Sequence, residues 1–332
     1  VLWFGTGRGL VKLEGGRFTT FTTTDGLCSD VVTSLAEDPQ GRLWVGTYEG
    51  LNCRAGGEWL RYTKEDGLAH SNVLSLYLDA QGCLWVGTYG GLTRMKDGRF
   101  DSYTTRDGLS NDSVWSLAGD AEGSLWMGTL GGLDRFRDTK FTVVGVPEGL
   151  QSDVVVSVLQ ARDGSLWVGT EGGGLTRFSG GASKTYRAAD GLGSDVVFAL
   201  AEDAAGTLWI GTDIGTLCKV EGGRIRQVPL AGADLKDTSI SAILPWPDGS
   251  LYLGTSIGLV RFEGGKAVLW RERDGLQGGL VNCLLAGRDG ALWSGTDGGG
   301  VCRFQDGRFT NIGRKDGLPD DVVLSLHEDG QG

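Results

Sequence analysis

The chain has 332 residues, and its 31 Lys and Arg against 42 Asp and Glu give a formal net charge of −11. An acidic chain lacks the basic stripe that nucleic-acid binding requires, and it is repelled by an anionic membrane surface. No apolar run is long enough to span a bilayer, so we expect no membrane contact by this segment.

A short phrase of the form Leu-Trp-x-Gly-Thr runs through the whole chain at a spacing of 41 to 43 residues. Its copies are Leu2–Thr6, Leu43–Thr47, Leu84–Thr88, Leu125–Thr129, Leu166–Thr170, Leu208–Thr212, Leu251–Thr255 and Leu292–Thr296. A period near forty with strand-like content is typical of a β-propeller, in which each repeat forms one four-stranded blade. The sequence therefore predicts an all-β, eight-bladed propeller.

Each repeat predicts four short strands separated by turn residues. In the second repeat these are an inner strand at Val31–Ala36, a second strand at Arg42–Thr47, a third at Leu51–Arg54 and an outer strand at Glu58–Thr63. Glu65–Leu68 then leads to the next blade.

The ends of the chain predict how the ring closes. The chain begins at a second strand, Leu2–Thr6, and ends with an inner strand, so we expect Leu2–Thr6 to pair with Val322–Leu326. That pairing would make residues 1–332 a single domain whose closing blade is shared by residues 1–24 and 318–332, and it would remove two exposed strand edges. Because the chain opens inside a repeat, we expect it to be a piece of a longer protein, and part of a longer array of repeats stays an alternative.

The recurring tryptophans predict packing between blades. Trp44 and Gly46 share one face of the second strand, so the ring is expected to lie over the space left by Gly and to wedge against the next blade. Cys53, Cys218 and Cys302 are expected to share one repeat position and, like the other three cysteines, to be small buried hydrophobes. Their spacing predicts neither a metal site nor a disulfide framework.

The pattern D-G-L-x4-V-x2-L-x2-D-x2-G-x-L-W-x-G-T-x2-G-L, seen in Asp66–Leu92 and Asp107–Leu133, resembles the two-component regulator propeller repeat. The resemblance implies the periplasmic or extracellular sensor part of a bacterial two-component signalling protein. It implies a non-enzymatic role without cofactors, a carbohydrate or other small extracellular ligand, and further domains in the parent chain. Members of that family often have seven blades, whereas eight are predicted here.

Enzyme alternatives find little support in the sequence. Asp163–Trp167 is similar to the Asp-box turn of sialidase propellers, but a sialidase's arginine cluster and nucleophilic Tyr cannot be singled out. A streptogramin-lyase-like site would need a His and an acid together, and the only histidines, His70 and His327, are expected near opposite ends of their strands. The recurring acids before Gly-Leu, such as Asp25, and before the inner strands, such as Asp30, are expected to cap their own turns.

Candidate binding residues lie where the repeats differ, on the connections after Leu-Trp-x-Gly-Thr and at the inner-strand position that Thr33 holds in the second repeat. They are Arg8, Tyr48, Tyr89, Trp115, Glu171, Phe198, Asp213 and Asp297. They pass from aromatic to acidic along the chain, which suits a sugar, and Leu230–Asp237 is expected to lean over the mouth as a partial lid. The short turns on the opposite face, Pro39–Gly41 and Ala80–Gly82, are expected to shape no site.

Two classes of function follow. The first is a ligand-sensing propeller, which a pocket at the mouth would favour. The second is a structural or protein-interaction scaffold, which a flat face with a large apolar patch would favour.

Overall fold

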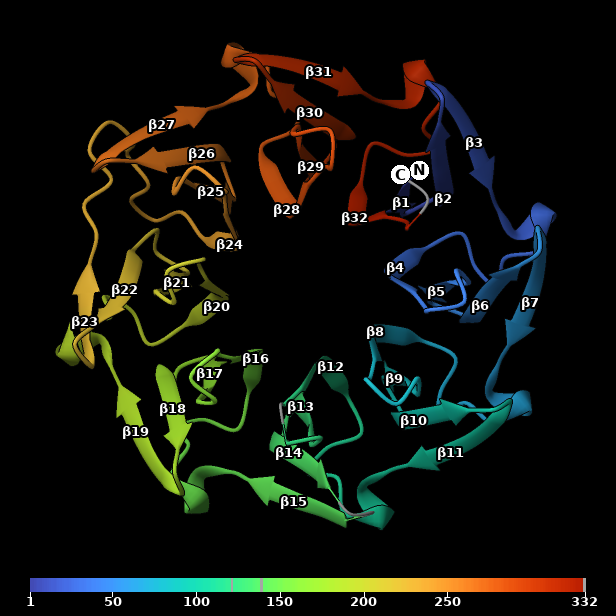
Figure 1. The fold of residues 1–332 in the computed structure, drawn as a ribbon, viewed down its shortest axis with the longest axis horizontal. Coiled ribbons are helices and arrows are strands. Elements are labelled where there is room, and N and C mark those ends of the chain that lie inside the picture. Colours follow the sequence, from blue (N-terminus) through green and yellow to red (C-terminus); the bar gives the residue numbers. More distant parts are fainter. Residues whose placement is uncertain (121, 138–139, 331–332) are drawn as a thin grey trace.

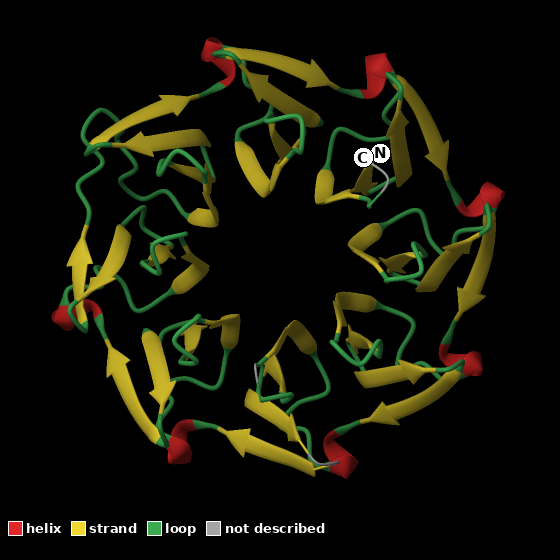
Figure 2. Cartoon of the chain, in the orientation of Figure 1, coloured by secondary structure: helices red, strands yellow, loops and turns green. Residues whose placement is uncertain are grey.

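Eight four-stranded antiparallel sheets stand in a ring in the computed structural model, which describes residues 1–120, 122–137 and 140–330 (Figure 1). In each sheet the inner strand lies nearest the axis and the fourth strand lies at the rim. The only helices in the described part are seven 3-10 helices of three residues each, which lie at the rim (Figure 2). The predicted eight-bladed β-propeller is confirmed.

The strands of the blades have nearly constant lengths. The inner strands are β4 (Val32–Glu37), β8 (Val73–Leu78), β12 (Val114–Gly119), β16 (Val155–Gln160), β20 (Val197–Glu202), β24 (Ile240–Pro245), β28 (Leu280–Ala286) and β32 (Val323–Glu328). The second strands are β1 (Leu2–Thr6), β5 (Leu43–Thr47), β9 (Leu84–Thr88), β13 (Leu125–Thr129), β17 (Leu166–Thr170), β21 (Leu208–Thr212), β25 (Leu251–Thr255) and β29 (Leu292–Asp297). The third strands are β2 (Gly9–Glu14), β6 (Gly50–Ala55), β10 (Gly91–Lys96), β14 (Gly132–Arg137), β18 (Leu175–Ser179), β22 (Leu217–Glu221), β26 (Gly258–Glu263) and β30 (Val301–Gln305). The rim strands are β3 (Arg17–Phe21), β7 (Glu58–Tyr62), β11 (Arg99–Tyr103), β15 (Lys140–Val144), β19 (Ala182–Tyr186), β23 (Arg224–Gln227), β27 (Lys266–Trp270) and β31 (Arg308–Ile312).

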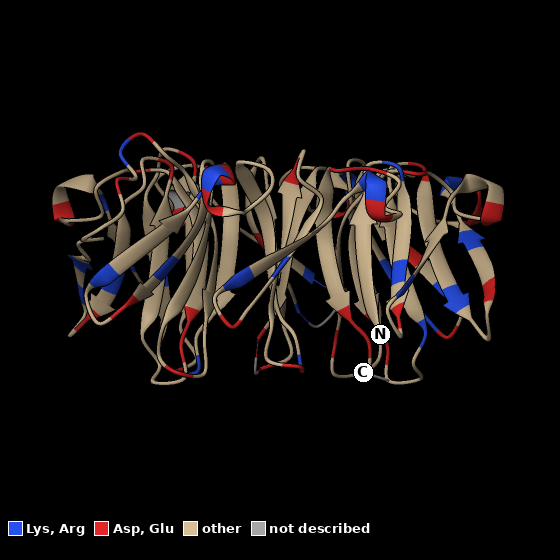
Figure 3. Cartoon of the chain, turned by 90° about the horizontal axis from the view of Figure 1, so that it is seen from above, with Lys and Arg blue, Asp and Glu red and all other residues tan. Residues whose placement is uncertain are grey.

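The ring has two different ends (Figure 3). We name as the connection face the end that holds the links from each rim strand to the next inner strand and the turns between second and third strands. The 3-10 helices lie at this end. We name as the turn face the opposite end, which holds the turns between inner and second strands. The N-terminus lies toward the turn face.

The closing blade combines both ends of the chain. Its sheet has the order β3-β2-β1-β32, so three strands from the N-terminal end receive an inner strand from the C-terminal end. Phe4 pairs with Leu326 and Leu2 pairs with Glu328. The predicted pairing is confirmed, and the partner segment is Val323–Glu328.

The Asp-Gly-Leu sequences form the links between blades. In the first, η1 (Thr23–Asp25), the Asp25 carboxylate accepts a hydrogen bond from the Thr22 backbone N–H at 2.9 Å. Gly26 ends the helix with φ 117°, in the left-handed region that favours glycine. Leu27 then inserts fully buried between the blades. The other such helices are η2 (Lys64–Asp66), η3 (Thr105–Asp107), η4 (Val146–Glu148), η5 (Ala188–Asp190), η6 (Glu272–Asp274) and η7 (Arg314–Asp316).

The hydrophobic core lies between blades. Each of eight buried clusters joins residues of two neighbouring sheets. In one of them Trp44 packs with Leu68, Val73, Leu84 and Val86 of the next blade. The predicted wedge of Trp between blades is therefore confirmed.

The glycine of Leu-Trp-x-Gly-Thr has a different role from the one predicted. Side chains other than Trp occupy the space beside Gly46: a Cβ there would overlap Ser34 Oγ and would lie 2.6 Å from Val73 Cγ1 of the next blade. Glycine is needed because the inner strands of two blades approach the second strand closely at this point. Its backbone is not in the left-handed region.

The segment from Leu230 to Asp237 forms no lid over the mouth. Leu235 is buried at the position of the Asp-Gly-Leu leucines, five residues before the inner strand that begins at Ile240. Ala231 accepts a hydrogen bond from the Ala267 backbone N–H of the rim strand β27 at 2.7 Å. The segment therefore lies along the rim, because burial of Leu235 fixes its path.

We expect amide hydrogens of β1 to exchange as slowly as those of β5, and those of β32 as slowly as those of the inner strand β4, because the ladder between β1 and β32 joins the two ends of the chain. Hydrogen exchange followed by mass spectrometry measures this. Rapid exchange in both strands would contradict the closed ring.

We expect Trp126→Ala to lower the free energy of unfolding by about 3–5 kcal/mol, since it empties a buried aromatic site between blades. Trp44→Ala and Trp167→Ala should behave alike. Urea unfolding measures the change, with Trp115→Ala as the matched control because Trp115 is exposed. Equal losses in Trp126→Ala and the control would refute the packing role.

Candidate functional site

The recurring acids on the connection face are structural. Asp30 Oδ1 accepts the Thr23 backbone N–H at 2.7 Å, and Asp112 Oδ1 accepts the Thr105 backbone N–H seven residues earlier in the same way. Asp153, Asp195 and Asp321 do the same in their links. The prediction that these acids cap their own turns is confirmed, so they are already occupied.

The residue after each Leu-Trp-x-Gly-Thr lies beside its inner strand. The Tyr48 backbone N–H donates to Val31 O at 3.2 Å, and the Tyr89 N–H donates to Asn72 O at 3.1 Å. In the closing blade the equivalent donor is Gly7 N–H, bonded to Val322 O, so Gly7 and not Arg8 holds this position. Arg8 is one residue further on, where its guanidinium lies 3.8 Å from the Asp320 carboxylate.

One residue near the start of every inner strand forms a β-bulge; it is the second residue of the strand in seven blades and the third, Asn282, in β28. The ladder between inner and second strands skips this residue in all eight blades. Bulges re-aim a side chain and increase local twist. Thr33 uses its hydroxyl to bond Val73 O of the next blade at 2.9 Å, and Ser241 and Asn282 make equivalent bonds to the next blade. The other five bulge residues are apolar, namely Leu74, Trp115, Val156, Phe198 and Leu324, and of these Trp115 and Phe198 carry aromatic rings.

Two of the predicted site residues contact each other. The rings of Tyr89 and Trp115, from neighbouring blades, meet edge to face with centroids 5.5 Å apart. Both are exposed, at 42% and 43%, and Tyr48 on the blade before is 48% exposed. Large apolar side chains that remain this exposed on three successive blades form a candidate binding surface, which we name the aromatic arc: Tyr48, Tyr89 and Trp115.

The acidic candidates follow on later blades. Glu171 and Asp297 are exposed, and Phe198 is half-buried. Asp213 keeps one carboxylate oxygen, Oδ1, buried without a hydrogen-bond partner. Among the described contacts, Tyr89 and Trp115 are the only pair of the eight predicted residues that touch, so the acids line the face without forming a cluster.

The histidines do not form a site together. His70 is exposed and its Nδ1 accepts the Asn72 backbone N–H at 3.0 Å on the connection face. His327 lies near the opposite end of the ring, with Nε2 3.7 Å from Glu37 Oε2 across a blade boundary. Burial lowers the pKa of His327, although the Glu37 carboxylate opposes that shift. The predicted separation of the two residues is confirmed.

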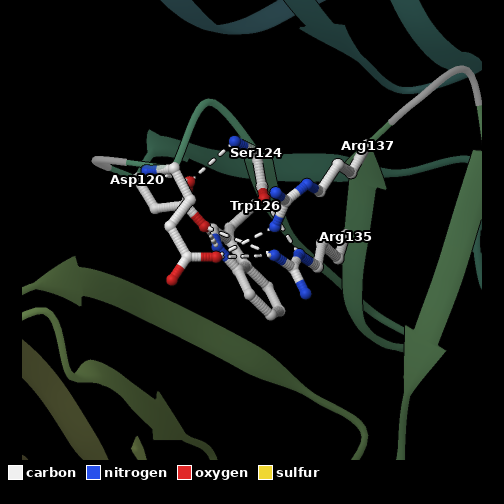
Figure 4. Close-up of polar contacts among 6 residues, drawn as sticks. Asp120, Ser124, Trp126, Arg135 and Arg137 are labelled. Carbon is white, nitrogen blue, oxygen red and sulfur yellow. Dashed lines mark hydrogen bonds and ion pairs between the residues drawn. The ribbon is translucent and has the colours of Figure 1, made fainter. Parts of the chain in front are cut away.

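The turn face carries a repeated cluster that the sequence analysis missed. In the blade β12–β15, Trp126 Nε1–H donates to Asp120 Oδ2 at 2.8 Å, and the Arg135 guanidinium lies 5.2 Å from the Trp126 ring centroid (Figure 4). The cation stands opposite Trp in the ladder between second and third strands. Equivalent cations over Trp are Lys12, Arg94, Arg177 and Arg303. The sequence signal for this cluster is the Lys or Arg that follows Gly-Leu-x in most repeats.

The acids of these clusters are held ionised. For Asp38, burial would raise the pKa, but hydrogen bonds from Trp44 Nε1–H, from the Arg42 backbone and from its guanidinium outweigh burial and lower it. The pKa of Asp120 and that of Asp203 are lowered in the same way. The carboxylates therefore act as hydrogen-bond acceptors that order the turn.

Hollows between blades open on the turn face, although its turns are short. One of about 530 Å³ lies between the blades β8–β11 and β12–β15 and is lined by Tyr77, Trp85 and Arg94. A second of about 510 Å³ lies between the blades β16–β19 and β20–β23 and is lined by Ala161, Trp167 and Arg177. Turns of constant length still differ in side chains, so the hollows at successive seams differ in their lining.

The six cysteines are free thiols. Cys218 and Cys302 share a register, opposite Ile210 and Ser294, but Cys53 lies opposite Trp44 and so one residue away, which corrects the predicted common position. Burial raises the pKa of Cys218 to about 12 and that of Cys53 to about 11, so these thiols are unreactive. No group of three or more His, Cys, Asp or Glu among the described residues could hold a metal ion.

The family of two-component regulator propellers matches this chain repeat by repeat, at residues 26–49, 67–90, 108–131, 149–172 and 191–213. These five repeats belong to the two-component regulator propeller repeat family. A comparison with curated protein sequences finds no match. The described part contains no helix with the length and apolarity needed to cross a membrane.

Solved structures share the fold of this propeller. The extracellular domain of a putative hybrid two-component system from B. thetaiotaomicron matches with a TM-score of 0.56 and 20% identity over 94% of this chain and 51% of that one. PorZ, a surface component of the type-IX secretion system of Porphyromonas gingivalis, matches with a TM-score of 0.62 and 17% identity over 90% of this chain and 50% of PorZ. Virginiamycin B lyase from Staphylococcus aureus matches with a TM-score of 0.58 and 13% identity over 79% of this chain and 90% of the lyase. The chain thus spans about half the length of the first two, and identities this low establish the fold alone.

We expect Asp38→Asn to destabilise the protein at pH 7 and pH 5, with the difference from the unchanged protein shrinking below about pH 4. The pKa of Asp38 is lower in the folded state, so its contribution is present above the unfolded pKa and is lost as pH falls through the folded one. Urea unfolding at several pH values measures this, with the exposed Glu58→Gln as control. A difference that stays constant down to pH 2 would contradict the role of the carboxylate.

Proposed function

We propose that this propeller is a non-enzymatic ligand-binding module, the extracytoplasmic sensing part of a bacterial two-component-type signalling protein. Membership of the repeat family and the likeness to an extracellular domain of such a system support the class of protein. The observation that carries the binding role is the exposed edge-to-face pair of Tyr89 and Trp115, flanked by Tyr48.

We propose a carbohydrate as the ligand. The C–H face of a sugar packs on an exposed aromatic ring, and carboxylates accept hydrogen bonds from its hydroxyls. The aromatic arc provides the rings, and Glu171, Asp213 and Asp297 provide carboxylates on later blades. Neither of the two hollows described above is lined by the aromatic arc, so the surface suits an oligosaccharide that lies across several blades better than one enclosed sugar.

A catalytic role and a cofactor are not part of the proposal. The recurring acids already cap turns or accept from Trp, and the two histidines lie apart. General acid–base chemistry would need such groups to converge on one substrate position.

A protein-interaction scaffold is the second candidate, and one observation favours it. Leu130, 45% exposed, and Ile214, 40% exposed, lie on the same face as the aromatic arc, and exposed apolar side chains of this size are frequent at protein interfaces. A partner protein would then replace the oligosaccharide at the same face.

We expect at least one member of an oligosaccharide panel to raise the melting temperature, because a ligand that binds only the folded state stabilises it. Tyr89→Ala and Asp213→Ala should each weaken that binding by about 1–3 kcal/mol with the fold intact, since each leaves a ligand group unpartnered. Calorimetric titration measures the loss.

The control is Gln81→Ala on the turn face. If Tyr89→Ala and Asp213→Ala bind the oligosaccharide unchanged and Gln81→Ala loses binding, the site lies on the turn face and the proposal is wrong. If no oligosaccharide raises the melting temperature and a protein partner binds through Tyr89, the protein-interaction scaffold is favoured.

A further inference from the structure

One blade lacks an acceptor that five others provide. In four of those five, the Asp six residues before Trp accepts the indole N–H at 2.8–2.9 Å; the pairs are Asp38 and Trp44, Asp79 and Trp85, Asp120 and Trp126, and Asp203 and Trp209. In the closing blade, Asp329 from the C-terminal end accepts the Trp3 indole N–H at 3.0 Å. In the blade β16–β19 this position is Ala161. No described residue accepts a hydrogen bond from Trp167 Nε1–H. Removal of the carboxylate therefore leaves a donor without a partner.

The missing acceptor coincides with open space. Ala161 and Trp167 line the cleft of about 510 Å³ between this blade and the blade β20–β23. The opposite wall consists of Leu208, Val220 and the turn at Ala204–Gly206. A volume of this size lies within the range of small-molecule sites.

Two guanidinium groups, Arg162 and Arg177, and two carboxylates, Asp163 and Glu202, line the cleft, and a cation lies beside the indole. The Arg177 guanidinium lies 5.4 Å from the Trp167 ring centroid and donates to Asp163 Oδ2 at 2.7 Å. Its Nε–H is buried without a partner. The second acid, Glu202, is already used, because its Oε2 accepts the Arg162 backbone N–H at 2.9 Å. The Arg162 side chain reaches Ala204 O at 2.9 Å, so a second guanidinium stands at the cleft.

Two other blades without the Asp show why this cleft differs. Gly287 replaces it beside Trp293, but the Trp293 Nε1 atom is buried, out of reach of a ligand. In the blade β24–β27, Trp246 occupies the position and packs edge to face on Tyr252 with centroids 5.1 Å apart. The Nε atoms of Arg94 and Arg261 in other blades are buried without a partner, like that of Arg177. The blade β16–β19 is therefore distinguished by the indole N–H of Trp167 at the cleft and not by its guanidinium.

We propose that this cleft binds the carboxylate of a small acidic ligand. One carboxylate oxygen accepts from Trp167 Nε1–H, at the place that an Asp carboxylate occupies in five other blades. Arg177 supplies the neighbouring positive charge. The site lies on the turn face, apart from the aromatic arc, and does not depend on the carbohydrate proposal.

The test follows the indole N–H signals by two-dimensional ¹H–¹⁵N NMR, with the Trp167 signal assigned from Trp167→Phe. The probe is sodium acetate, titrated at constant ionic strength. We expect a saturable shift of the Trp167 signal, and an at least tenfold weaker effect of acetamide, which has the same shape without the charge. The Trp209 signal should stay unchanged, because Asp203 already holds that indole.

Ala161→Asp supplies the acceptor from within the chain. We expect it to abolish the acetate shift and to raise the melting temperature, while Ala80→Asp, which adds the same charge to a turn of another blade, leaves the shift in place. If Ala161→Asp does not fold, Leu208→Trp, which narrows the cleft from the opposite wall, should also reduce the shift. No saturable shift, an equal shift with acetamide, or an equal shift of Trp209 would overturn the proposal.

Discussion

The structure depends on the close approach of neighbouring blades along the second strands. At each seam the Trp of one blade packs on apolar side chains of the next, and a glycine two residues later lets the inner strands of both blades come near. A single sheet of this kind could not bury its own apolar face, so each blade requires its neighbours. Closure of the ring by β32 against β1 gives the first and last blades the same support.

The same constraint explains which residues are uniform and which vary. Side chains that enter a seam, such as Leu27 and Val73, are fixed by burial. Acids that cap the links or hold the Trp indole are fixed by hydrogen bonds, as Asp30 and Asp38 show. Variation is left to the bulge residues, to the short turns after Leu-Trp-x-Gly-Thr, and to the turn face wherever a seam tolerates a smaller residue. Those are the places where one repeat scaffold acquires binding surfaces.

The two faces differ in the kind of surface they offer. The connection face presents exposed rings on successive blades, an arrangement suited to an extended ligand. The turn face presents clefts between blades, whose depth depends on pairs of residues from different repeats, such as Ala161 and Leu208. A replacement in one repeat thus changes a site that two repeats share.

The sequence alone determined the blade number, the strand order within a blade, the closure of the ring and the structural role of the recurring acids. These features repeat, and each is a local consequence of turn chemistry, strand alternation and a constant period. Only the tertiary structure decided which variable residues meet. The contact of Tyr89 with Trp115, the rim path of the segment around Leu235 and the cleft beside Trp167 each join residues of different blades. Spacing within one repeat carries no information on such contacts, because the packing angle between sheets and the side chains of both neighbours set them.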